Sequence, residues 1–200
     1  MRRAAYVTPE TCGMGHAVRG VALVEAAGRA GVELRAFGPS LAGAPNGYEG
    51  SADWRARVVA WAPDLLLGDI QWVQLDALRA ELAVPAWLLL RWMPPGHLAD
   101  RGPWQIGRWE RRIAIEPIAV QDGVTHLAHP VVMESPRFAP VDGQELRAGY
   151  NTYWEAVRFG YRDRVRWTDG GSPERRARLE HGGELGALNG ADEVVGWIAA

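Results

Sequence analysis

The stretch between residues 5 and 37 constrains the fold of this 200-residue chain more than any other. A short β-branched and aromatic run leads into the loop Glu-Thr-Cys-Gly-Met-Gly-His, and a helical pattern over residues 17–30 follows it. Gly31 can end that helix because glycine adopts the left-handed conformation without strain, and residues 32–37 are typical of a second strand. Units of the form strand-loop-helix-strand build parallel sheets with right-handed crossovers.

The same alternation continues along the chain. The apolar runs 64–68 and 85–90 are typical of strands buried on both faces, and apolar residues recur at helical spacing between them. We therefore predict an α/β fold with a doubly wound, Rossmann-like parallel sheet. Its predicted strands are 4–8, 32–37, 64–68, 85–90, 112–118 and 124–132, its helices are 17–30, 54–61 and 72–82, and residues 38–50 form a loop.

The chain changes character after a proline-containing linker at residues 133–143. Helical patterns begin near residues 149, 173 and 192, and residues 164–168 resemble a short strand. We predict two parts: a Rossmann-like domain over residues 1–140, and an α-rich segment over residues 141–200 that is a reduced remnant of a second α/β domain.

Composition excludes several classes of protein. A net charge of −2 gives no reason to expect nucleic-acid binding. The single cysteine, Cys12, excludes an internal disulfide framework and a cysteine-rich zinc site. No apolar run approaches the roughly 18 residues needed to span a bilayer, and the N-terminus lacks the apolar core of a secretory signal. We expect a cytoplasmic protein.

The loop around Gly13 and Gly15 allows a ligand to approach the backbone closely, and the next helix presents its amides there. His16 lies at the mouth of this loop, where ligands of open parallel sheets bind. The spacing is neither the dinucleotide fingerprint nor a Walker loop. Glycines also serve tight turns for purely structural reasons, so both interpretations of the loop stay open.

Asp69 follows the predicted strand 64–68 at its carboxyl end. Because neighbouring parallel strands converge at one edge, this carboxylate can orient the His16 imidazole and stabilise its protonated form. Asp69 can equally cap the helix that begins near residue 71. The two roles are compatible.

A tryptophan-rich segment over residues 87–109 is the next candidate. It can line an apolar or sugar-binding wall that includes Trp92, or its tryptophans can fill the core. Arg91 follows a strand end and can contact an anion, or it can be solvated. The remaining histidines lack the spacing of metal ligands.

Gly149-Tyr-Asn-Thr-Tyr-Trp-Glu155 is the second informative stretch. A glycine followed by Asn151 and Thr152 at a helix start combines backbone donors, side-chain donors and the positive end of the helix dipole. This combination suits an anion, although an ordinary Asn or Thr helix cap has the same pattern.

Several stretches together resemble the GT-B glycosyltransferases, in particular the branch of the peptidoglycan lipid-intermediate N-acetylglucosaminyltransferase and the macrolide and glucuronosyl transferases. Gly13-Met-Gly-His16 with its helix resembles their first loop, and Pro63-Asp-Leu-Leu-Leu-Gly-Asp69 resembles their Pro-Asp-apolar-Asp strand. Gly149-Tyr-Asn-Thr resembles their donor loop, and Ser172-Pro-Glu174 resembles a later helix, with Arg175 where glutamine is usual.

The resemblance implies a role for each matched position. His16 would deprotonate the acceptor, assisted by Asp69. Gly149, Asn151 and Thr152 would contact the donor diphosphate. Glu155 would follow on the same helix, and Glu174 would contact the donor sugar. On the acceptor side we expect Gly13, Gly15, Arg91 and Trp92.

The implied activity is transfer of a sugar from a nucleotide sugar to a hydroxyl of a small-molecule or lipid-linked acceptor. The nucleotide sugar is then a co-substrate, and no metal ion is required. Members of the family have about twice this length and two complete domains. The alternative is therefore a non-catalytic binding or regulatory subunit whose protein partner supplies the donor domain. A homodimer is a further expectation.

Overall fold

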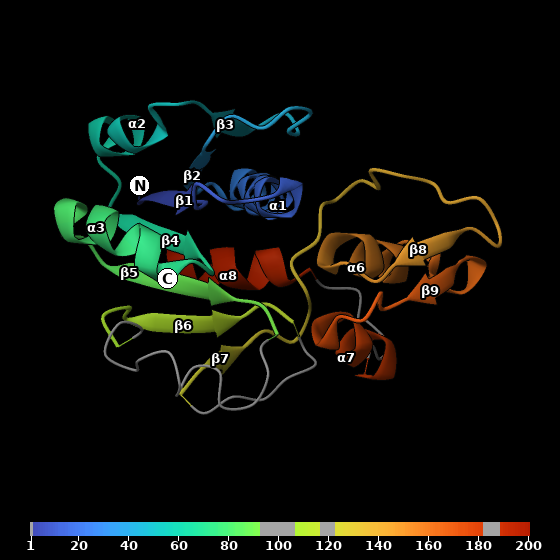
Figure 1. Ribbon diagram of the computed structural model, residues 1–200. Coiled ribbons are helices and arrows are strands. Elements are labelled where there is room, and N and C mark those ends of the chain that lie inside the picture. The colour runs from blue at the N-terminus through green and yellow to red at the C-terminus, as the bar shows by residue number, and fades with distance from the viewer. Residues whose placement is uncertain (1, 93–106, 117–122, 182–188) are drawn as a thin grey trace.

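The computed structural model describes residues 2–92, 107–116, 123–181 and 189–200 (Figure 1). Within these residues the chain forms a large parallel sheet flanked by helices and a smaller segment beside it. The strands of the large sheet are β1 (Arg3–Val7), β2 (Glu33–Gly38), β3 (Tyr48–Gly50), β4 (Leu65–Asp69), β5 (Ala86–Leu90), β6 (Arg111–Ala114) and β7 (Thr125–His126). Its helices are α1 (Met14–Ala30), α2 (Trp54–Trp61) and α3 (Trp72–Leu82).

The large sheet has seven strands in the order β3-β2-β1-β4-β5-β6-β7, and every neighbouring pair is parallel. The chain starts in the middle, winds to one edge and then crosses over β1 to build the other half. This is the order of a doubly wound sheet, so the predicted fold class is confirmed.

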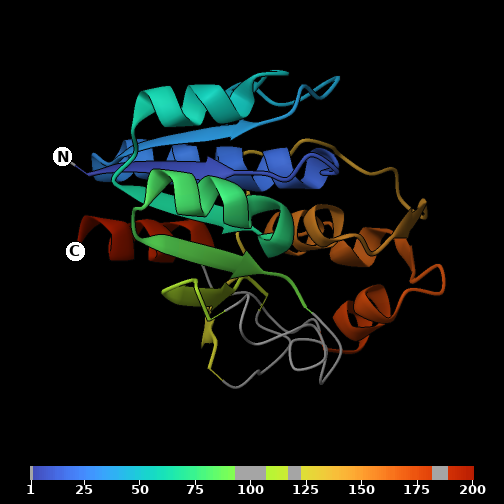
Figure 2. The ribbon, with the colours of Figure 1, turned by 60° about the vertical axis from the view of Figure 1, so that its left-hand side comes forward.

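Alternate residues of the strands enter two separate cores. Tyr6, Leu67 and Leu89 face one side, where α1 and the C-terminal helix α8 (Gly190–Ala199) cover the sheet. Val7, Leu66 and Leu88 face the other side, under α2 and α3. In Figure 2, α2 and α3 lie in front of the sheet and α1 and α8 lie behind it. Burial on both faces explains why these strands are continuous apolar runs.

The first helix ends as its sequence predicts. Gly31 has a φ of 68° and lies in the left-handed region, and its amide bonds to the Ala27 carbonyl. Gly20, in the middle of α1, has a different role. A Cβ at this position would lie 2.6 Å from the Tyr6 ring and 2.9 Å from the Ala36 Cβ, so the absence of a side chain lets α1 approach β1 and β2.

The structure differs from the predicted strands at three places. Residues 48–50, inside the predicted loop, form β3 and pair with the end of β2. Strand β6 ends at Ala114, and the predicted end at residues 117–118 lies outside the described part. Of the predicted strand 124–132, only β7 is a strand in the structure. It does not continue because Pro130 has no amide proton and the amides of Val131 and Val132 bond to side chains of Tyr150 and Asn189.

The C-terminal segment begins with β8 (Glu145–Arg147), which the sequence did not predict. It continues with α6 (Tyr150–Arg158), the 3-10 turn Arg162–Arg164, β9 (Arg166–Thr168) and α7 (Pro173–His181). Strands β8 and β9 pair in parallel as a separate two-stranded sheet. In Figure 1 the arrowheads of β4 and β5 point toward this segment, which therefore lies at the carboxyl edge of the large sheet.

The last helix returns to the large sheet. Val194, Val195 and Ile198 of α8 pack in the same core as Leu23 of α1. The predicted boundary at residue 140 stays a prediction. Helix α8 follows that boundary in the sequence but packs against α1 and the large sheet, which precede it.

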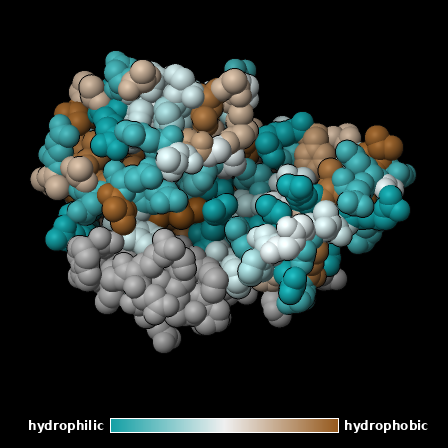
Figure 3. All heavy atoms as spheres, viewed as in Figure 1, coloured by the Kyte–Doolittle hydropathy of each residue, from teal (hydrophilic) through white to brown (hydrophobic). Residues whose placement is uncertain are grey.

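The surface of the described residues is mixed. Large hydrophobic side chains are strongly exposed at Val73 and Val141. On the face shown in Figure 3, hydrophobic residues lie as separate spots among hydrophilic ones. None of the described helices is both long and apolar enough to cross a bilayer.

Candidate functional site

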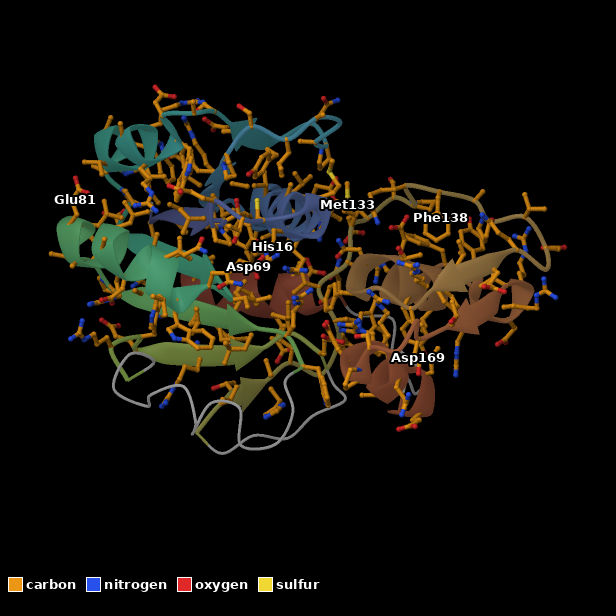
Figure 4. All side chains as sticks on the ribbon, viewed as in Figure 1. His16, Asp69, Glu81, Met133, Phe138 and Asp169 are labelled. Carbon is orange, nitrogen blue, oxygen red and sulfur yellow. The ribbon has the colours of Figure 1, made fainter. Side chains whose placement is uncertain are left out.

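The parallel pairing of β1 and β4 brings the first loop and Asp69 together. Val7, the last residue of β1, pairs with Gly68, so Asp69 ends β4 directly beside the loop that follows β1. His16 lies in the first turn of α1, after that loop. Figure 4 shows the two labelled side chains next to each other. They are 53 residues apart in sequence and meet at the carboxyl edge of the sheet.

The two side chains are joined by a hydrogen bond. The distance from His16 Nδ1 to Asp69 Oδ2 is 2.9 Å. Two bare acceptors at this distance would repel each other, so we assign the proton to Nδ1, which donates it to the carboxylate. Arg19 Nη2, 3.1 Å from the same nitrogen, then donates to Asp69 at 2.7 Å and not to the ring. In the neutral form of this tautomer, Nε2 is the unprotonated nitrogen. The His16 side chain is 13% exposed and that of Asp69 is completely buried.

Two further residues donate to the same carboxylate oxygen. Arg19 lies one turn after His16 on α1 and donates from Nη2 at 2.7 Å and from Nε at 3.2 Å. Tyr6 of β1 donates its hydroxyl proton to Asp69 Oδ2, and its hydroxyl lies 2.9 Å from the His16 carbonyl oxygen. The second carboxylate oxygen, Oδ1, is buried and has no hydrogen-bond partner among the described residues.

These contacts determine the ionisation of the group. Burial alone would raise the pKa of Asp69, but the charge of Arg19, followed by the contacts with His16, holds that pKa well below its usual range. Burial and the nearby carboxylate raise the pKa of Tyr6 well above 10. Asp69 is therefore an anion and Tyr6 a neutral donor at neutral pH.

The structure brings the two predicted loops into direct contact. Asn151, in the first turn of α6, donates from Nδ2 to the carbonyl oxygen of Gly15 at 3.0 Å. Gly149 is the N-cap residue of α6, and Thr152 follows Asn151 in the first turn. The glycine loops before α1 and α6 thus begin neighbouring helices at the same edge of the large sheet.

The two predicted donor-side glutamates are both engaged by arginines. Glu155 is 1% exposed and accepts from the Arg137 backbone amide and, at 2.9 Å, from its Nε. Glu174 is partly exposed and is paired with Arg178, and its carboxylate lies 3.7 Å from Nη1 of Arg91. The donor role of these glutamates stays a prediction.

The predicted acceptor-side residues lie at the start of α1 and just after the end of β5. Gly13 is the N-cap residue of α1, and Gly15 follows in its first turn. Arg91 and Trp92 follow β5, and the Trp92 amide donates to Glu116 at 3.1 Å. Of the tryptophan-rich segment, Trp87 and Trp109 belong to the two cores, and residues 93–106 lie outside the described part.

A second buried charged cluster lies beside the first, and the sequence did not indicate it. Glu116, just after β6, forms two hydrogen bonds of 2.6 Å and 2.8 Å with Arg178 of α7, and both side chains are 1% exposed. Trp154 donates its indole proton to Glu116 at 3.2 Å. The guanidinium groups of Arg19 and Arg178 lie 5.0 Å and 5.5 Å from the centre of the Tyr150 ring.

Sequence reasoning assigned no role to Arg19, although a signal existed. Arg19 is three residues after His16, a spacing that places both on one helix face, and it interrupts the small and apolar run of residues 17–24. Glu116 and Arg178 are 62 residues apart and carried no comparable signal. Among the described residues, no three His, Cys, Asp or Glu side chains lie close enough together to hold a metal ion.

The fold and the site together define a class of protein: a doubly wound parallel α/β protein with a histidine–aspartate pair at the carboxyl edge of its sheet, next to the start of a second helix. No family model matches the chain, and no curated protein sequence matches it.

Several solved structures are similar to the chain. "Spinosyn Rhamnosyltransferase SpnG" is 16% identical, with a TM-score of 0.48 over 74% of this chain and 56% of that one. The Streptomyces sp. SF2575 glycosyltransferase SsfS6 is 14% identical, with a TM-score of 0.48 over 74% and 62%. A UDP-glucosyltransferase from Polygonum tinctorium is 10% identical, with a TM-score of 0.47 over 90% and 70%.

The chain thus spans 56% and 62% of the length of the first two proteins. All three are described as glycosyltransferases.

Proposed function

We propose that this chain takes part in the transfer of a sugar from a nucleotide sugar to an acceptor hydroxyl. One observation carries the proposal: His16 is hydrogen-bonded through Nδ1 to the buried Asp69, while the Asn151 side chain contacts the same loop. This geometry supports the proposal, because the proposed base and the proposed anion-binding helix start lie at one edge of the sheet. The motif resemblance gives the chemistry that such a pair would perform.

In the proposed reaction, Nε2 of His16 takes the proton of the acceptor hydroxyl. The acceptor oxygen forms a bond to the anomeric carbon of the sugar, and the bond from that carbon to the diphosphate oxygen breaks. The leaving diphosphate keeps the electron pair. Asp69 holds the imidazole in the tautomer with Nε2 free and stabilises the imidazolium that forms.

The donor side rests on the start of α6. Gly149, Asn151 and Thr152 would hold the donor diphosphate, because the first amides and the positive end of the helix dipole favour an anion there. This arrangement would offset the negative charge that builds up on the leaving group. Glu174, partly exposed, would contact the sugar.

The experiment that tests this proposal measures binding and turnover separately. Thermal shift with UDP and with thymidine diphosphate should show stabilisation of the wild type and of H16A, since His16 is assigned to the acceptor. Transfer or hydrolysis of the matching nucleotide sugar should fall at least a hundredfold in H16A and stay near wild type in H126Q. His126 lies on β7 at an edge of the sheet and serves as the matched histidine control.

Unchanged turnover in H16A would remove the base assignment. No stabilisation by any nucleoside diphosphate would contradict the donor assignment.

A second candidate function is a non-catalytic binding or regulatory subunit. The observation that favours it is that arginines already engage both predicted donor-side glutamates. Glu155 is paired with Arg137, and Glu174 is paired with Arg178. This candidate predicts no thermal stabilisation by a nucleoside diphosphate alone. It also predicts turnover only when a second protein that supplies a donor domain is added.

A further inference from the structure

Arg19 is a buried cation that lies between the proposed base and the C-terminal segment. Its side chain is 1% exposed, and its guanidinium contacts Asp69, His16 and the Tyr150 ring. Tyr150 belongs to α6, so Arg19 touches both helices whose starts form the candidate site. Neither the motif resemblance nor the proposed reaction assigns it a role.

The charges around His16 balance only if Arg19 is counted. The titratable groups that face His16 and Arg19 among the described residues are Asp69, Tyr6 and Tyr150. The two tyrosines stay neutral at physiological pH because burial raises the pKa of both. Asp69 carries one negative charge, and Arg19 carries one positive charge. With both present, the imidazole needs no second proton.

The geometry gives two separate reasons why Arg19 disfavours an imidazolium. First, Arg19 Nη2 lies 3.1 Å from His16 Nδ1, so a protonated ring would place two positive charges in contact. Second, Arg19 supplies two of the hydrogen bonds to Asp69 Oδ2, while Oδ1 has no partner among the described residues. Without Arg19, this completely buried carboxylate would depend on His16 for its counter-charge.

We propose that Arg19 is a positioning residue whose permanent charge balances Asp69 and so keeps His16 a neutral base with Nε2 free. The proposal rests on the proposed function for its catalytic meaning. Its charge balance is a property of the folded chain and is measurable without any substrate.

The test is ¹⁵N NMR of the imidazole nitrogens in the full chain at pH 7.5, with His16 assigned by comparison with H16A. The wild type should show a neutral ring with the proton on Nδ1. R19Q, which keeps a hydrogen-bond donor and removes the charge, should show both nitrogens protonated. R19K, which keeps the charge, should restore the neutral ring.

The matched control is R178Q. It removes the other buried guanidinium that lies over the Tyr150 ring and leaves Asp69 and His16 in place. The His16 nitrogens should be the same in R178Q as in the wild type. A change of equal size in R178Q would overturn the proposal, because the effect would then come from loosened packing and not from the charge of Arg19.

A neutral, Nδ1-protonated His16 in R19Q would also overturn the proposal. If R19Q does not fold, the tautomer of the wild type decides: a neutral ring protonated on Nδ1 supports the proposal, and an imidazolium or a ring protonated on Nε2 overturns it. In a turnover assay, R19Q should lower kcat at least tenfold with KM for the nucleotide sugar changed less than twofold, and R19K should recover most of kcat. If the wild type has no turnover, the proposed function fails while the NMR result still decides the role of Arg19.

Discussion

Four donor atoms from three residues point at a single oxygen of Asp69. They come from Tyr6 on β1 and from His16 and Arg19 on α1. A carboxylate that accepts this many hydrogen bonds and has a cation beside it stays ionised even when it is completely buried. At the scale of the residue, the site is therefore an anion held by its surroundings, and any change to that anion affects all of its donors.

The first prediction concerns D69N. This variant keeps the size of the side chain but leaves Arg19 buried without a counter-charge, so unfolding free energy at pH 7 should fall by about 3–5 kcal/mol. Urea unfolding followed by circular dichroism measures the change. D142N removes the carboxylate of a strongly exposed ion pair with Arg164, and we expect it to cost at most about 1 kcal/mol.

The same variant predicts a pH dependence. Because folding lowers the pKa of Asp69, its stabilising contribution is complete above the unfolded pKa of about 3.9 and is lost as pH falls through the folded pKa. The difference in stability between wild type and D69N should therefore shrink as pH falls below about 4. A difference that stays constant down to pH 2.5 would contradict the ionised state of Asp69.

At the scale of the element, helix α1 determines the geometry of the site. It carries His16 and Arg19, and the missing side chain of Gly20 lets it lie close to β1 and β2. Tyr6 contacts this helix from β1, and its hydroxyl reaches Asp69. A shift of the helix away from the sheet would therefore move both His16 and Arg19 away from Asp69.

The second prediction compares two glycines of this helix. A Cβ on Gly20 would meet the Tyr6 ring and Ala36, so G20A should destabilise the protein by about 1–3 kcal/mol. A Cβ on Gly28 would meet nothing within 4 Å, so G28A should stabilise it by about 0.5–1 kcal/mol through helix propensity. Opposite signs in thermal or urea unfolding are expected. Equal effects would show that α1 is not packed as described.

At the scale of the whole molecule, buried and exposed ion pairs join segments that are far apart in sequence. Glu116 after β6 pairs with Arg178 on α7, which fixes the C-terminal segment to the edge of the large sheet. Arg29 on α1 contacts Glu134 and Asp192, which joins the linker and α8 to the same helix, but at the surface. Breaking the Glu116–Arg178 pair should cost more stability than breaking the Arg29 pairs, because only the Glu116–Arg178 pair is removed from water.

The third prediction uses that contrast. R178M leaves the Glu116 carboxylate buried without its cation and should lower the unfolding free energy by about 3–5 kcal/mol. R29M removes a half-exposed arginine of similar connectivity and should cost at most about 1 kcal/mol. Urea unfolding measures both, and limited proteolysis should show earlier cleavage within residues 133–181 in R178M alone. Similar costs for the two variants would contradict the burial of the Glu116–Arg178 pair.

The sequence by itself determined the doubly wound sheet, since its apolar runs, helical spacings and the stop at Gly31 are local signals that each element carries. It also indicated the two loops and the pair of His16 and Asp69, because parallel strands place their carboxyl ends at one edge. Only the tertiary structure decided the short strands β3 and β8, whose pairing depends on neighbours and not on their own residues. It also decided the partners of the buried charges. Glu116 and Arg178 look like solvated residues in a linear sequence, and only packing removes them from water and makes their counter-charges necessary.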